Sequence, residues 1–189
     1  ELLIQFLNFL EVIFRRSSYL SLLKEYPKAI HQVLRLLQAS HWASEYLMKH
    51  PHLLDELLLV DHQKYSVDDE DSYWQEWQKT IEEKIHFILH NEQDEEEVWN
   101  MLRQAHQSEI FQILLADLGG FNTAQLTLEK VSDRLSKLAD IIITLTLNFV
   151  WDRLKSKFPI TRPLCESGFA VIAYGKLGGK ELGYGSDLD

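Results

Sequence analysis

Apolar residues recur at three- and four-residue spacing along the chain as far as residue 158, and this helical period is the feature that most constrains its fold. The pattern is broken into short stretches by prolines, glycines and capping residues, which is typical of a bundle and not of a coiled coil. The chain is therefore expected to be mostly α. The helices are predicted over residues 2–14, 19–25, 27–37, 40–48, 51–58, 74–90, 94–118 and 127–158.

Residues suited to helix ends support these boundaries. Ser17 or Ser18 is expected to cap the second helix and Ser40 the fourth, because a serine oxygen accepts from the first free N–H groups. Pro27 and Pro51 suit first helical turns. The acidic run 94–97 is expected to start a helix, because acidic residues in a first turn are favoured by the helix dipole. Gly119-Gly120 is expected to end that helix. The acidic stretch 61–71 is a predicted loop.

Charge and composition narrow the classes of function. The 189 residues carry a formal net charge of -10, so the chain lacks the basic surface that duplex nucleic acid requires, and no nucleic-acid partner is expected. The single cysteine, Cys165, forms no internal disulfide, which favours a cytoplasmic setting. The most apolar stretch, 141–151, is too short for a membrane span of roughly 20 residues, so no membrane association is expected.

The character of the chain changes at Gly168. The run Phe169–Tyr174 is short, continuously apolar and rich in β-branched residues, which predicts a buried strand. Five glycines follow it closely, which is typical of a loop at a functional site. These glycines are Gly175, Gly178, Gly179, Gly183 and Gly185.

The end of the chain combines a glycine pair with paired aspartates. Gly178 and Gly179 allow backbone N–H groups to approach a phosphate, and a short helical turn after them would direct more N–H groups the same way. Asp187 and Asp189 lie two residues apart, so on a strand they face one side and can share a magnesium site. Ser186 precedes them. The combination predicts phosphoryl or nucleotidyl transfer with Mg²⁺.

Other interpretations of these residues exist. An isolated Asp-x-Asp also occurs on solvated strands and in calcium loops, and the glycine pair lacks the Lys-Ser/Thr of a P-loop. Lys176 and Lys180 could contact phosphates or be solvated loop charges, and Glu181 is expected to brace the turn. The eight histidines show no supported zinc-ligand spacing.

Two motifs at the end of the chain carry a family resemblance. Leu177-Gly178-Gly179 and Asp187-Leu188-Asp189 resemble the signature of the polymerase-β-like nucleotidyltransferases. The whole stretch 168–189 looks more closely like bacterial glutamine synthetase adenylyltransferases. Further segments share that likeness, so it spans nearly the whole chain. They are 18–27, 50–58, 103–117 and 130–133.

The resemblance implies a bifunctional enzyme with two homologous halves. One half transfers AMP from ATP to a tyrosine of glutamine synthetase and the other removes it by phosphorolysis. The segments with Tyr-Pro and Pro-His-Leu-Leu-Asp-Glu-Leu, and the ending, look more like the adenylylating C-terminal half. The alternatives are the deadenylylating half and a helical docking module for glutamine synthetase or a PII-type regulator without activity by itself.

The resemblance also assigns roles to single residues. Asp187 and Asp189 match the catalytic metal ligands, Gly178 and Gly179 match the nucleotide-binding turn, and Ser186 is expected to contact a phosphate. The family's third carboxylate lies on a later strand. Because the chain starts without methionine and ends inside an expected strand, both ends are expected to be cuts, and the piece alone is expected to be inactive.

These expectations define a fold and two domains. A helical bundle is expected to lead into the first strands of a truncated α/β polymerase-β-like nucleotidyltransferase domain. Residues 1–120 form the predicted helical domain. Residues 121–189 form the predicted long helix and the start of the nucleotidyltransferase domain.

Overall fold

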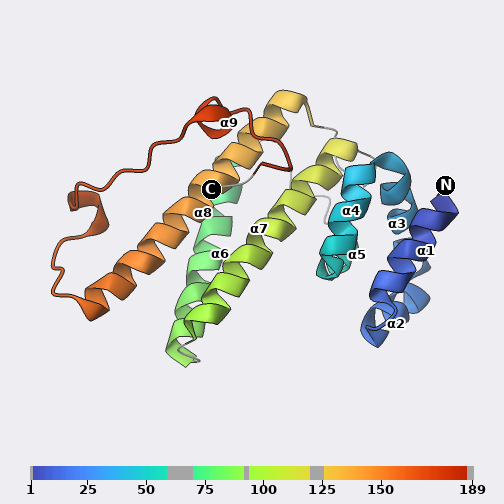
Figure 1. The fold of residues 1–189 in the computed structure, drawn as a ribbon, viewed down its shortest axis with the longest axis horizontal. Helices are drawn as coiled ribbons and strands as arrows, with labels where there is room; N and C mark the ends of the chain where they lie inside the picture. The colour runs from blue at the N-terminus through green and yellow to red at the C-terminus, as the bar shows by residue number, and fades with distance from the viewer. Residues whose placement is uncertain (1, 59–69, 92–93, 120–125, 187–189) are drawn as a thin grey trace. The chain divides into compact units, whose positions relative to one another are not determined.

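The structure is a computed structural model that describes residues 2–58, 70–91, 94–119 and 126–186. The expectation of a mostly α chain is confirmed, and the predicted helices are present with boundaries shifted by a few residues (Figure 1). None of the described helices is long and apolar enough to cross a membrane. The elements are α1 (Leu2–Ile13), α2 (Ser17–Glu25), α3 (Pro27–Ala39), α4 (His41–Lys49), the 3-10 helix η1 (Pro51–Leu53), α5 (Leu54–Leu58), α6 (Glu70–Asn91), α7 (Glu95–Leu118), α8 (Leu128–Lys157), the 3-10 helix η2 (Leu164–Glu166) and α9 (Gly175–Gly178).

Capping explains several helix ends and corrects one prediction. Ser40 caps α4 as expected, since its Oγ accepts from the Ala43 N–H at 3.2 Å. The predicted cap at Ser17 or Ser18 is wrong, because α2 begins at Ser17 and Arg16 occupies the cap position without a side-chain hydrogen bond. The acidic loop is also shorter than predicted on its described side, because Glu70 begins α6.

The chain divides into two compact units, and one of the three points at which it passes between them falls inside α7. Unit 1 contains Glu1–Tyr65 and Ile110–Leu126, and unit 2 contains Ser66–Glu109 and Thr127–Asp189. The predicted domain boundary at residue 120 lies outside the described residues and stays a prediction.

Unit 1 is organised around α3, which contacts α1, α2, α4 and α5. The second part of α7 adds to this core, because every residue from 111 to 116 is buried. Phe111 stacks on Tyr46 with ring centroids 6.5 Å apart, and Gln112 Nε2 donates to Glu56 Oε2 at 2.6 Å. The largest fully buried side chains of this unit are Phe9, Ile13, Leu36, Leu37, Leu47, Leu53, Leu54, Leu57, Phe111, Ile113 and Leu115.

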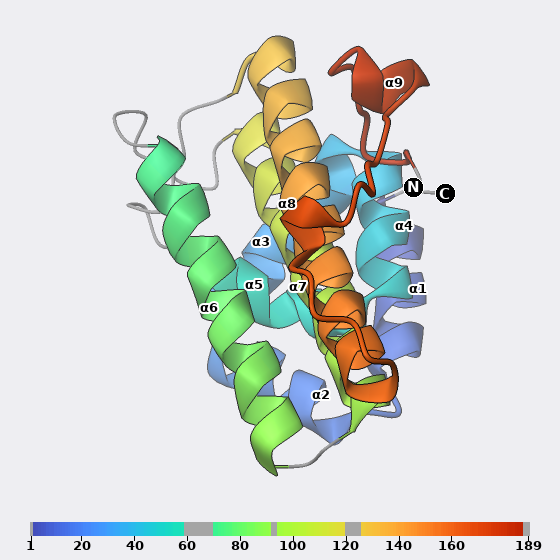
Figure 2. The same ribbon diagram turned by 90° about the vertical axis from the view of Figure 1, so that its left-hand side faces the viewer.

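Unit 2 consists of α6, the first part of α7, α8 and the segment that follows α8 (Figure 2). Trp99 of α7 meets Phe149 of α8 edge to face at 5.0 Å. The buried Arg134 on α8 donates from Nε to Glu70 Oε1 on α6 at 2.8 Å. These contacts make α8 the central support of unit 2.

The predicted strand Phe169–Tyr174 is not formed. This segment is extended and exposed, with Phe169 60%, Ile172 72% and Tyr174 84% accessible. A strand needs a neighbouring strand for its backbone hydrogen bonds, and the described part of the chain contains none. The expectation of a buried strand is therefore wrong for this structure, and the α/β part of the predicted fold is not seen among the described residues.

Candidate functional site

The candidate site lies in the segment after α8, which turns back along that helix (Figures 1 and 2). It brings α9 beside the N-terminal half of α8. Between residues 158 and 186, Leu182 is the only buried residue. The glycine-rich turn is therefore an exposed loop with one buried attachment to unit 2.

The glycine turn closes on itself through backbone hydrogen bonds. The N–H of Gly178 donates to Tyr174 O at 3.4 Å, and that of Gly179 donates to Gly175 O at 2.9 Å. The Glu181 N–H donates to Lys176 O at 2.7 Å. Hence the helical turn α9 ends at Gly178, the first glycine of the pair, and does not follow the pair. The N–H groups of both glycines are engaged within the turn, and their role in phosphate binding stays a prediction.

Gly178 is sterically required at its position. A Cβ there would lie 2.5 Å from Ala173 O and 3.1 Å from Ala173 C, both backbone atoms. Gly175 is required for a different reason, since its φ of 60° lies in the left-handed region that favours glycine. Gly179 is less constrained, because its Cβ would meet Gly175 O at an ordinary 3.4 Å. The turn geometry thus depends on two glycines of the motif.

Ser186 closes a second small turn immediately before the predicted metal ligands. Its Oγ accepts from the Gly183 N–H at 3.1 Å, and its own N–H donates to Gly183 O at 3.0 Å. Asp187 and Asp189 lie outside the described residues, so their assignment as metal ligands stays a prediction. In this conformation the Ser186 hydroxyl supports the turn, and its contact with a phosphate is untested.

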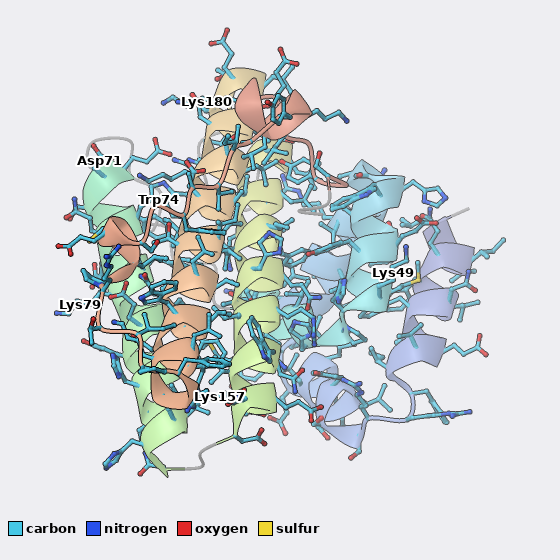
Figure 3. All side chains as sticks on the ribbon, turned by 60° about the vertical axis from the view of Figure 1, so that its left-hand side comes forward. Lys49, Asp71, Trp74, Lys79, Lys157 and Lys180 are labelled. Carbon is cyan, nitrogen blue, oxygen red and sulfur yellow. The ribbon has the colours of Figure 1, made fainter. Side chains whose placement is uncertain are left out.

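A pocket of about 470 Å³ adjoins the turn. In Figure 3, Asp71 and Trp74 mark its α6 wall and Lys180 its loop wall. Both carboxylates and ammonium groups line it, so it presents negatively charged acceptors and positively charged donors of hydrogen bonds. No cluster of metal-ligating side chains occurs among the described residues. The lining residues are Glu70, Asp71, Trp74, Asp133, Ser136, Lys137, Asp140 and Lys180.

Lys180 combines this position with unusual backbone geometry. Its φ of 55° is the only positive value of a non-glycine residue in the described part of the chain. A left-handed conformation costs a residue with a side chain roughly 1 kcal/mol or more. Lys180 is exposed and lies at the edge of the pocket, so the choice between a phosphate contact and a solvated loop charge stays a prediction.

Sequence reasoning missed the residues that attach the turn to the helices. Ser132 of α8 donates from Oγ to Leu182 O at 3.2 Å, and the Leu182 side chain is 7% exposed. The sequence offers one signal for this attachment, because Leu182 is an apolar residue inside a polar, glycine-rich loop. Nothing in the pattern indicated that Ser132 would be its partner.

Comparison with known proteins gives the family context. The family model described as glutamate-ammonia ligase adenylyltransferase matches residues 30–189. A bifunctional glutamine synthetase adenylyltransferase/adenylyl-removing enzyme of Ralstonia nicotianae is 46% identical over 98% of this chain. Enzymes with the same name in Burkholderia mallei and Nitrosomonas eutropha are 44% identical over 100% and 41% identical over 97% of the chain.

The similarity includes both units and the glycine turn. The chain spans 18% of the length of these curated relatives, so it corresponds to one part of each. The matched range contains the turn, Ser186 and the two aspartates at the end of the chain. The chain therefore belongs to the glutamate-ammonia ligase adenylyltransferase family.

Proposed function

We propose that this chain is part of an enzyme that transfers AMP from ATP to a tyrosine of glutamine synthetase. The observation that carries the proposal is the sterically required Gly178 turn, which stands nine residues before Asp187 in a chain of this family. The relatives are named glutamine synthetase adenylyltransferases, which supports the same protein substrate.

In the proposed reaction the glycine turn and Ser186 hold the triphosphate of ATP. The substrate tyrosine oxygen forms a bond with the α-phosphorus, the bond from that phosphorus to the bridging oxygen breaks, and pyrophosphate leaves. The phenolic proton passes to solvent. Two carboxylates and phosphate oxygens are hard ligands of the kind that Mg²⁺ prefers, so Asp187 and Asp189 fit this ion. When bound, it would neutralise charge on the phosphates.

The helical units would serve as the scaffold and docking surface. We propose that they contact glutamine synthetase, with a PII-type regulatory protein as a further partner, in the cytoplasm. The net charge of -10 favours protein partners over nucleic acid. The single cysteine, Cys165, is exposed and unpaired, which suits a reducing compartment.

A second activity is supported by the relatives, which are also named adenylyl-removing enzymes. In that case the same turn would position inorganic phosphate and the AMP group attached to tyrosine. A phosphate oxygen would form a bond with the AMP phosphorus, the bond to the tyrosine oxygen would break, and ADP would leave. The turn suits both reactions because each one places phosphate groups against it.

The test uses the full-length protein that contains this chain, with unmodified glutamine synthetase, labelled ATP and Mg²⁺. We expect labelled AMP on tyrosine, and we expect Asp187→Asn with Asp189→Asn to abolish it. Asp152→Asn, a change at an exposed carboxylate on α8, is the matched control and should retain activity. Phosphate-dependent release of ADP from adenylylated glutamine synthetase, without AMP incorporation, would favour the second activity. Absence of both reactions would refute the proposal.

A further inference from the structure

The buried attachment of the glycine turn is confined to one residue. Leu182 is 7% exposed, whereas its neighbours Glu181 and Gly183 are exposed. Because no other residue between 158 and 186 is buried, the side chain of Leu182 is the main apolar anchor of this segment on unit 2.

A hydrogen bond reinforces the anchor. Ser132 Oγ donates to the Leu182 carbonyl at 3.2 Å across fifty residues of sequence. Serines and threonines within helices often donate to the carbonyl four residues earlier, as the Thr144 hydroxyl does to Asp140 O at 2.7 Å. Ser132 instead joins α8 to the loop. We call Ser132 and Leu182 together the α8 clasp.

We propose that the α8 clasp positions the nucleotide-binding turn, and that Ser132 is a positioning residue for AMP transfer. The proposal rests on the proposed function for its kinetic consequence. It concerns the reacting end of the chain because Leu182 stands between the glycine pair and Asp187. The turn between Leu182 and Asp187 is closed by two hydrogen bonds between Ser186 and Gly183. A shift of Leu182 should therefore be passed on to the residues that follow this turn.

The pocket beside the turn lies close to the clasp. Lys180, two residues before Leu182, lines this pocket together with residues of α6 and α8. Its left-handed backbone, with φ 55°, is a conformation that a residue with a side chain seldom adopts. Because Lys180 is so close to Leu182 in the chain, loss of the clasp should move Lys180 as well as the turn.

The experiment measures hydrogen exchange and kinetics in the full-length protein. Ser132→Ala should raise amide exchange in residues 175–186 by about fivefold, because it removes one partly buried hydrogen bond. Leu182→Ala should raise it more, since the anchor itself is lost. Ser132→Thr keeps the hydroxyl and should restore the original exchange. Ser156→Ala is the matched control, because Ser156 is exposed near the other end of α8 and donates to Arg153 O.

The kinetic readout separates positioning from general folding. Ser132→Ala should lower kcat for AMP transfer severalfold and leave the KM for glutamine synthetase unchanged, with recovery in Ser132→Thr. Unchanged exchange in Ser132→Ala and Leu182→Ala would overturn the clasp itself. Faster exchange with unchanged kcat would overturn its positioning role. If the unsubstituted enzyme transfers no AMP, the proposed function fails, and the exchange data still decide whether the clasp exists.

Discussion

The substitution Gly178→Ala tests whether the glycine turn is sterically determined. The added Cβ would stand 2.5 Å from the carbonyl oxygen of Ala173, whereas ordinary contacts begin at 3.4 Å. The peptide must therefore move by roughly 0.9 Å, a distance that side-chain adjustment alone cannot supply because the clashing atoms are backbone.

The expected cost follows from this displacement. Overpacking of this kind costs about 1–3 kcal/mol. Alanine gains up to about 1 kcal/mol over glycine in a helix interior, but α9 has only 4 residues, so little of that gain applies. We expect the turn to be destabilised by about 1–2 kcal/mol, with little change in the unfolding of the helices.

Hydrogen exchange of residues 174–181 measures this loss directly, and ATP titration measures its effect on binding. Gly183→Ala is the matched control, because a Cβ at Gly183 would meet no atom within 4 Å. Exchange should increase in Gly178→Ala and stay unchanged in Gly183→Ala. Equal behaviour of the two variants would refute the steric argument.

Two further predictions concern the helical units. Burial raises the pKa of Tyr46 to about 12, so the folded state retains the phenolic proton after the unfolded chain has lost it. The free energy of unfolding should therefore fall from about pH 10 toward pH 12, and Tyr46→Phe should remove this decline in urea titrations. Glu70→Gln should destabilise unit 2 by about 1–2 kcal/mol, because the buried Arg134 loses its charged acceptor. An unchanged midpoint temperature of thermal unfolding would contradict this.

The helices were accessible to sequence reasoning because their signals are local. The apolar period, the Ser40 cap and the proline starts each depend on residues within one or two turns, and the structure has them where they were predicted. The cap of α2 was misplaced by one or two residues, because α2 includes both serines and starts without a side-chain cap from Arg16. The helical turn at the glycine motif was expected after the pair but ends at its first glycine, Gly178.

The strand prediction at Phe169–Tyr174 went wrong for the opposite reason. Its apolar, β-branched composition favours a buried strand, but pairing and burial require a partner from elsewhere in a structure. The described residues provide no such partner, and the side chains are exposed.

The sequence by itself determined that the chain is helical over most of its length, and it predicted a nucleotide and metal site from the glycine pair and the paired aspartates at its end. Short-range periodicity and motif spacing are sufficient for both conclusions. Only the tertiary structure decided that Gly178 lies against the Ala173 carbonyl and that Leu182 anchors the turn to Ser132. The second contact joins residues 50 positions apart, and no local pattern encodes such a pair, because packing selects it from many compatible partners.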